Sequence, residues 1–280
     1  NRAQYIIQER HYDTDAVRNY LFKELGGIGS TSIQKNIFQT DPICFYIDID
    51  ILFSLGEKGW EDMLHFGGRI EEVVPVGSMF MEYYWFNNPK KNNHYYHDVL
   101  LLGQNISHAY EREDKFSQFM TDYYNCFRWL VRFKLENPNY SIAIMHHASS
   151  GSKVDEIERK ILLNSEISVL NKLDDSYQAA FNSKCNVTYG STMGYELIGH
   201  SVPVIFMDTD YRCTFLPHVH NDKYNDIDFF RAGSYSEFSD LLLNILQLNN
   251  LFSSYEGNID KICLESSDVS NKIYKKMNKH

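Results

Sequence analysis

The chain has 280 residues, 43% of them hydrophobic, so it can form a full core, and extensive disorder is not expected. Its formal net charge of −10 argues against a nucleic-acid-binding protein, because phosphate contacts need clustered Lys and Arg. The five cysteines form no C-x-x-C pair, and no apolar run approaches the roughly 20 residues of a membrane span. These features predict a cytoplasmic protein.

The N-terminal part, residues 1–80, is interpreted as the C-terminal part of an α/β domain. Strands are expected over 43–50 and 73–78, with a short helix over 60–66 between them. Residues 81–96 mix aromatic and polar side chains and are interpreted as a linker. Because the first residue is Asn, we expect further domains in a longer polypeptide.

From residue 97 onward, apolar strands alternate with helical patterns. Strands are expected over 98–103, 141–146, 167–170, 187–189 and 202–207. Helices are expected over 114–135, 153–163, 175–182 and 191–199, with further helices in the C-terminal segment 251–280. This alternation predicts an α/β fold with a parallel sheet and helices on both faces. Ligands of such sheets bind beyond the carboxyl ends of the strands, where the strand order reverses.

The most informative stretch runs from Asn186 to Asp208. It indicates a short strand, a glycine-led turn, a helix that opens at Ser191 and Thr192, and a second strand. The first N–H groups of a helix lack internal partners and attract anions, and the two hydroxyl groups add donors. Glu196, about one turn further on, can reach a ribose hydroxyl. The alternative is that Ser191 and Thr192 only cap their helix.

The order of these parts resembles a GT-B glycosyltransferase, an architecture of two Rossmann-like domains, over about residues 20–250. The strings PVGS, LLLGQN and GSTMGYELIGHSVPVIF carry the likeness. More narrowly, the chain resembles bacterial transferases that use CMP-activated sugars, the sialyltransferases and Kdo transferases of capsule and lipopolysaccharide assembly. Their acidic pair, His-Pro and Ser-Ser or Ser-Thr motifs are matched by Glu113-Asp114, His146-His147 and Ser191-Thr192. The Pro is absent here, and Lys115 stands where a Gly is usual.

The resemblance implies two Rossmann-like domains, an incomplete acceptor-side one over 1–80 and a nucleotide-sugar-binding one over 97–250. It implies transfer of Kdo or a sialic-type sugar from a CMP donor onto a bacterial surface glycan, such as lipopolysaccharide O-antigen or capsule, without a metal or other cofactor. The loop after the first strand of the second domain carries only Arg112, which favours a donor with one phosphate. The alternatives are a transferase that uses a UDP-, GDP- or dTDP-sugar, a nucleotide-sugar epimerase, and a non-catalytic binding module.

Asp114 and Glu113 are the candidate catalytic carboxylates, because both lie near the start of a long helix. One of them would act as a general base or as a nucleophile. The alternative is that Asp114 caps the helix and Glu113 is solvated. Asp48 and Asp50 are further candidates for a base. The D-x-D strings at 48–50 and 208–210 are discounted as metal sites.

Two histidines end the strand expected over 141–146. Because strand side chains alternate, one should point into the packing and the other, preferably His147, toward the ligand. Either His146 or His147 would donate to a phosphate or act as a general acid. Gln104 and Ser150 follow strands and are expected to bind the nucleotide sugar, and Lys172 lies in the segment expected to receive the base.

The only dense basic stretch, residues 272–279, lies at the C-terminal end. Such a stretch is usually a solvated last helical turn. The alternative is a peripheral contact with the anionic inner face of the inner membrane, where the acceptor glycan would be lipid-linked.

Overall fold

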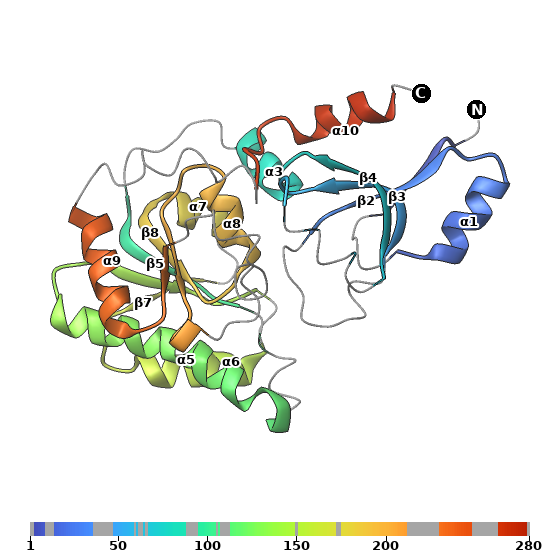
Figure 1. The fold of residues 1–280 in the computed structure, drawn as a ribbon. Coiled ribbons are helices and arrows are strands. Elements are labelled where there is room, and N and C mark those ends of the chain that lie inside the picture. The colour runs from blue at the N-terminus through green and yellow to red at the C-terminus, as the bar shows by residue number, and fades with distance from the viewer. Residues whose placement is uncertain are drawn as a thin grey trace. The chain divides into compact units, whose positions relative to one another are not determined.

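The computed structural model describes residues 3–8, 14–35, 47–58, 60, 64, 67–87, 95–104, 106, 113–148 (113–117 by backbone alone), 151–171, 175–211, 230–247 and 263–278. The chain forms two compact units. One comprises Asn1–Pro89 together with Gly257–His280, and the other comprises Lys90–Glu256. Each unit has its own parallel sheet, which confirms the α/β class (Figure 1).

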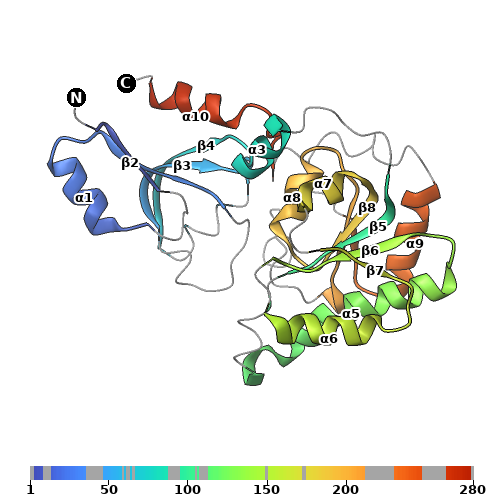
Figure 2. The same ribbon diagram turned by 180° about the vertical axis from the view of Figure 1, so that it is seen from behind.

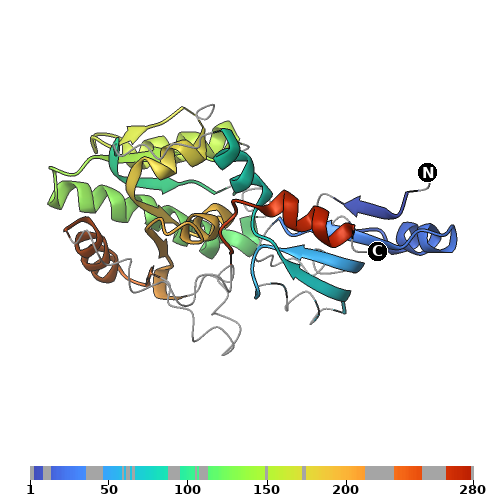
Figure 3. The ribbon, with the colours of Figure 1, turned by 90° about the horizontal axis from the view of Figure 1, so that it is seen from above.

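The first unit is built on a four-stranded parallel sheet of order β1-β2-β3-β4. Its elements are β1 (Tyr5–Gln8), α1 (Ala16–Glu24), β2 (Gly29–Ile33), β3 (Asp48–Ser54), β4 (Arg69–Pro75), α3 (Met79–Asn87) and α10 (Val269–Met277). Val269 of α10 packs in one buried cluster with Phe53 and Val76, so the C-terminal helix covers this sheet. Figure 3 shows α10 alongside β3 and β4. Helix α3 begins at Met79 and overlaps the start of the segment 81–96 that was expected to be a linker.

Two strands of this unit differ from the expected bounds. Strand β3 begins at Asp48, whereas the strand expected from the sequence ended at residue 50. Strand β4 begins at Arg69, four residues before the expected start at residue 73. Charged side chains at the start of each strand made these starts hard to predict from the sequence. In the structure their charges are paired, because Arg69 of β4 contacts both Asp48 and Asp50 of β3. The expected helix over 60–66 lies mostly outside the described residues.

The second unit has a six-stranded parallel sheet of order β10-β9-β8-β5-β6-β7. Its strands are β5 (His97–Leu102), β6 (Ile142–Met145), β7 (Ser168–Val169), β8 (Ser183–Thr188), β9 (Val204–Met207) and β10 (Phe230–Ala232). Its helices are α5 (Glu113–Glu136), α6 (Ser152–Leu162), α7 (Ser176–Phe181), α8 (Thr192–Ile198), the 3-10 turn η3 (Thr209–Tyr211) and α9 (Tyr235–Gln247). Helices α5, α6 and α9 lie on one face and α7 and α8 on the other (Figures 1 and 2). The helices on both faces were predicted.

Strand β8 is longer than the apolar segment 187–189 that predicted it. Its first residues, from Ser183 to Asn186, are mostly polar, yet the strand is paired with β5 on one side and β9 on the other. Buried Asn186 is accommodated because its side-chain amide donates to the carbonyl of Ala180 at 3.0 Å. Pairing on both sides therefore extends the strand beyond its hydrophobic part.

The strand order reverses between β5 and β8. From β5 the chain moves outward through β6 to β7, then returns to β8 and moves the other way through β9 to β10. In open α/β sheets the crevice outside the carboxyl ends of the two strands at such a point is where ligands bind. The second unit therefore has one preferred ligand edge, after Leu102 and Thr188. Within the described ranges, no helix is both long and apolar enough to cross a membrane.

Candidate functional site

The turn after β8 is tied to the end of β5 by one buried side chain. The Thr188 hydroxyl donates to the carbonyl of Leu102 at 3.3 Å and accepts the backbone N–H of Ser191 at 3.1 Å. Thr188 is fully buried, so solvent does not compete for these bonds. A Cβ at Gly194 would lie 3.0 Å from the Thr188 methyl group, so the glycine lets α8 approach β8 closely. The start of α8 is thereby held at the point where the strand order reverses.

Ser191, Thr192 and Glu196 all lie at this turn or in the helix that follows. Ser191 is the N-cap residue of α8, but its side chain makes no capping hydrogen bond. Ser191 and Thr192 are half-buried. Glu196 is buried one turn into the helix, and the hydroxyl of Tyr177 on α7 donates to its carboxylate at 2.6 Å. The turn thus combines a half-buried hydroxyl that does not cap its helix with a carboxylate of fixed orientation.

The ends of β5 and β6 approach each other closely at Gly103. Its N–H donates to the carbonyl of Met145 at 2.9 Å. A Cβ at this position would lie 2.7 Å from the Met145 oxygen and 2.9 Å from the His147 nitrogen, both backbone atoms. Only glycine fits without a shift of the backbone. Gln104 follows directly, half-buried at the ligand edge.

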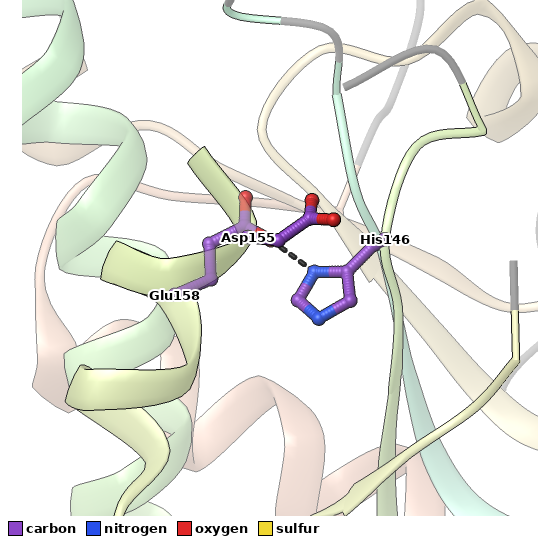
Figure 4. Close-up of side chains that lie close together, drawn as sticks. All are labelled: His146, Asp155 and Glu158. Atoms are coloured by element: carbon purple, nitrogen blue, oxygen red, sulfur yellow. Dashed lines mark hydrogen bonds and ion pairs between the residues drawn. The ribbon is translucent and has the colours of Figure 1, made fainter. Parts of the chain in front are cut away.

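His146 and His147 differ in exposure as the alternation of a strand predicts. His146 is 2% exposed, and its Nδ1 pairs with Oε2 of Glu158 on α6 (Figure 4). His147 is half-buried. The second oxygen of Glu158 accepts from the hydroxyl of Tyr123 on α5 at 2.8 Å, and that hydroxyl accepts the backbone N–H of Gln104 at 3.2 Å. A buried network therefore connects the loop after β5 to the end of β6.

Tyr123 and Glu158 were not among the site residues predicted from the sequence. The signal for Glu158 was its spacing, because Val154, Glu158 and Leu162 recur every four residues and form the buried face of α6. A carboxylate on an apolar stripe needs a buried partner. Burial raises the pKa of the Tyr123 hydroxyl well above its usual value, and the neighbouring Glu158 carboxylate raises it further. Tyr123 therefore remains a hydrogen-bond donor over the whole working pH range.

His146, Asp155 and Glu158 are also the described residues with the donor types and spacing to hold a metal ion. One donor atom from each lies within 4.8 Å of the others. Figure 4 shows the carboxylates of Asp155 and Glu158 on the Nδ1 side of the imidazole ring. Both oxygens of Glu158 already have partners in Tyr123 and His146. A cation would have to displace one of them, so we interpret the cluster as a hydrogen-bond network.

The remaining expected site residues are described only in part. Glu113 and Asp114 are the first two residues of α5, which agrees with their expected place at a helix start, and their side chains are outside the described part. Ser150 and Lys172 also lie outside the described residues.

Asp48 and Asp50 occupy the amino end of β3, opposite to the carboxyl edge where ligands of α/β sheets bind. Asp50 accepts hydrogen bonds from Lys23 at 2.7 Å and from the backbone and hydroxyl of Ser30 at 2.7 and 3.0 Å. Burial alone would raise the pKa of Asp50, but these hydrogen bonds outweigh it and lower the pKa. The two carboxylates thus stabilise the first unit and are not placed as bases.

A further buried carboxylate, Asp208, follows β9 at the ligand edge of the second unit. It pairs with the guanidinium group of Arg231 on β10, which lies 4.8 Å from the ring centroid of Tyr211. The pair satisfies Asp208 and neutralises Arg231. The second D-x-D string, 208–210, therefore contributes an ion pair, and Arg231 adds no net positive charge for a phosphate.

No protein-family model matches the sequence, and no curated protein matches it. Solved structures do match. A Listeria monocytogenes protein described as a UDP-N-acetylglucosamine 2-epimerase matches with a TM-score of 0.64 at 12% identity, over 99% of this chain and 74% of its own. S. aureus MnaA in complex with UDP has a TM-score of 0.63 at 14% identity, over 98% and 74%. A variant of S. aureus TarM in complex with Fondaparinux, α-GlcNAc-glycerol and UDP has a TM-score of 0.50 at 11% identity, over 91% and 52%. These similarities show that the chain has a GT-B-like fold of two Rossmann-type units.

Proposed function

We propose that the protein is a glycosyltransferase that binds a nucleotide sugar at the carboxyl ends of β5 and β8. The observation that carries the proposal is the turn that Thr188 fixes to Leu102, where the strand order reverses. Such turns present backbone N–H groups to phosphate. Ser191 and Thr192 add hydroxyl groups next to them, and the Ser191 hydroxyl does not cap its own helix.

The other expected site residues have roles that fit this position. Glu196, held by Tyr177, would accept hydrogen bonds from the ribose hydroxyl groups. Gln104 would bind oxygens of the sugar or phosphate beyond β5. Ser150 and Lys172, which lie outside the described residues, are expected to contribute as well. Binding of phosphate and ribose would explain why a buried carboxylate lies next to this turn.

The catalytic roles follow the resemblance in the sequence. Asp114 or Glu113, at the start of α5, would deprotonate the acceptor hydroxyl or attack the anomeric carbon. His147, the less buried of the two histidines, would donate to the departing phosphate. Replacing Asp114 by Asn should abolish transfer while nucleotide binding persists, whereas a non-catalytic binding module would lose nothing.

The donor nucleotide is either CMP or UDP, and different observations favour each. The sequence motifs and the single Arg112 favour CMP with Kdo or a sialic-type sugar. The similar structures favour UDP, because MnaA and TarM were both solved with UDP. We propose UDP as the first donor to test and CMP as the second. The acceptor would be a glycan of the bacterial surface.

A nucleotide-sugar epimerase is the second candidate function. The Listeria protein and MnaA have higher TM-scores than TarM, and the former is described as a UDP-N-acetylglucosamine 2-epimerase. An epimerase would isomerise UDP-N-acetylglucosamine with no acceptor present. A transferase would leave the sugar unchanged until an acceptor is added.

The first experiment is a thermal-shift panel with CMP, CDP, UDP, GDP and dTDP. A ligand of the folded state raises the melting temperature by mass action. A shift with UDP or CMP would support nucleotide-sugar binding and identify the base, and Ser191→Ala should reduce it. If none of the five nucleotides shifts the melting temperature, the proposed function is wrong.

Contact with a membrane is a separate part of the proposal. Lys276 pairs with Glu72 at 2.6 Å, and Lys272 donates to the carbonyl of Val76 at 3.3 Å, so both are engaged within their own unit. Lys275 is exposed. Sedimentation with vesicles containing anionic lipid, compared for the wild type and Lys275→Glu, tests whether this helix contributes to peripheral binding at the inner membrane and access to a lipid-linked acceptor.

A further inference from the structure

We propose that Glu158 and Tyr123 are positioning residues that act through His146, so that its Nε2 donates a hydrogen bond to a phosphate oxygen of the bound nucleotide. The inference rests on the proposed function and assigns two residues to the same site. Its starting point is one atom. Nε2 of His146 is buried and has no hydrogen-bond partner among the residues that the structure describes. A buried nitrogen without a partner is unfavourable, so a native structure should supply one.

The direction of the hydrogen bonds fixes which nitrogen of His146 is engaged. The backbone N–H of Gln104 donates to the Tyr123 oxygen, so the Tyr123 hydroxyl proton is directed to Oε1 of Glu158. The other oxygen, Oε2, pairs with Nδ1 of His146. Nδ1 is therefore occupied from the α6 side, as Figure 4 shows, and Nε2 is the nitrogen left for a ligand.

The charge of the buried pair decides whether Nε2 carries a proton. If Nε2 is protonated and one proton is shared between Nδ1 and Oε2, the His146–Glu158 pair is neutral overall, wherever the shared proton lies. If Nε2 is unprotonated, the pair carries one negative charge with both side chains 1% exposed. An uncompensated buried charge is strongly unfavourable. The neutral state is therefore preferred, and in that state Nε2 is a donor that suits an anionic oxygen.

The groups that face His146 support the same state. Among the described residues these are Tyr123 on α5 and both Asp155 and Glu158 on α6. Tyr123 is uncharged, and Asp155 is a second carboxylate that would repel a negatively charged His146–Glu158 pair. His146 also directly follows β6, next to the strand end where Gly103 and Gln104 reach the ligand edge.

The test compares the same substitution at two positions of α6. In Glu158→Gln, the amide can still accept from Tyr123 and donate to Nδ1, but it carries no charge, so Nε2–H becomes a neutral donor. The matched control is Glu156→Gln, since the Glu156 side chain is 64% exposed and pairs with Lys160 on the helix surface. The probes are UDP and CMP, and the dissociation constant is measured by calorimetry between pH 5.5 and 8.5.

We expect Glu158→Gln to weaken nucleotide binding about tenfold or more across this range, the loss of a charge-assisted hydrogen bond. Glu156→Gln should bind both probes like the wild type. Tyr123→Phe should reduce affinity by a smaller factor, because the His146–Glu158 pair remains.

Nitrogen-15 NMR of the ligand-free protein gives a readout that needs no nucleotide. With the His146 signals assigned from a His146→Gln spectrum, Nε2 should be protonated at neutral pH in the wild type. An unprotonated Nε2 would overturn the inference. It would also be overturned if Glu158→Gln had a lower melting temperature than the wild type but bound nucleotide as tightly as Glu156→Gln at every pH. If the wild type binds neither UDP nor CMP, the proposed function itself fails. If all variants bind equally tightly, only the inference about Glu158 and Tyr123 fails.

Discussion

The strongest test of the proposed phosphate-binding turn is the substitution Thr188→Val. Valine keeps the volume of threonine and replaces the hydroxyl by a methyl group. The two hydrogen bonds of the Thr188 hydroxyl, to the Leu102 carbonyl at 3.3 Å and from the Ser191 N–H at 3.1 Å, are then lost. The matched variant Thr188→Ser keeps the hydroxyl and removes the methyl group that packs near Gly194. The pair separates the hydrogen bonds from the packing.

The magnitudes follow from burial. Thr188 is fully buried, so the N–H of Ser191 is left without this partner in Thr188→Val, at a cost of about 1–3 kcal/mol. Thr188→Ser loses the burial of one methyl group, about 0.8 kcal/mol. For a domain of this size each kcal/mol lowers the melting temperature by about 2–4 °C. Both variants should therefore fold, with Thr188→Val the less stable.

Nucleotide binding should distinguish the two variants sharply. If the Ser191 N–H donates to phosphate in an orientation that Thr188 fixes, Thr188→Val should raise the dissociation constant for the bound nucleotide about tenfold or more. Thr188→Ser should bind nearly as tightly as the wild type. Calorimetry on both folded variants measures this directly. Equal affinity of Thr188→Val and the wild type would refute the assignment of phosphate to this turn.

Three further predictions concern single residues elsewhere. Glu196→Gln should weaken UDP about tenfold but 2′-deoxy-UDP much less, measured by calorimetry, because the carboxylate is expected to bind the ribose hydroxyl groups. Gly103→Ala should destabilise by about 1–3 kcal/mol, because its Cβ would lie within 3 Å of two backbone atoms of the neighbouring strand end, and thermal melting would show it. Asp50→Asn should lower the free energy of unfolding by about 2 kcal/mol at neutral pH, measured by urea denaturation. The pKa of Asp50 is lower in the folded state than in the unfolded chain, where it is about 3.9. The carboxylate therefore contributes its full stabilisation above the unfolded pKa and loses it as pH falls through the folded pKa. The stabilities of the wild type and Asp50→Asn should converge in acid.

Much of the second unit could be predicted from the sequence because its sheet is parallel and covered on both faces. Strands such as β5 and β6 are then nearly continuous apolar runs, and their neighbours are amphipathic helices. The polar start of β8 could not be predicted, since pairing with two neighbours holds it in the sheet. The position of the ligand edge follows from strand order, which a sequence does not display.

The candidate site shows the same division between local and non-local information. Ser191 and Glu196 could be proposed from a local pattern of strand, turn and helix. Tyr123 and Glu158 could not, because their contacts join α5, α6 and the ends of two strands. The one local sign was a carboxylate on the apolar stripe of α6. A charged residue at such a position therefore indicates a buried partner elsewhere in the chain, although it does not identify that partner.

The aspartates of β3 show how a small shift in strand bounds changes a functional interpretation. An expected strand over 43–50 placed Asp48 and Asp50 at its carboxyl end, where α/β sheets bind ligands. The observed strand runs from Asp48 to Ser54 and places both at its amino end. The same residues are then stabilised by Lys23 and Arg69 and have no access to the ligand edge of their sheet. For carboxylates near a strand, the end of the strand on which they lie matters more than their spacing, and only the pairing of the strands determines that end.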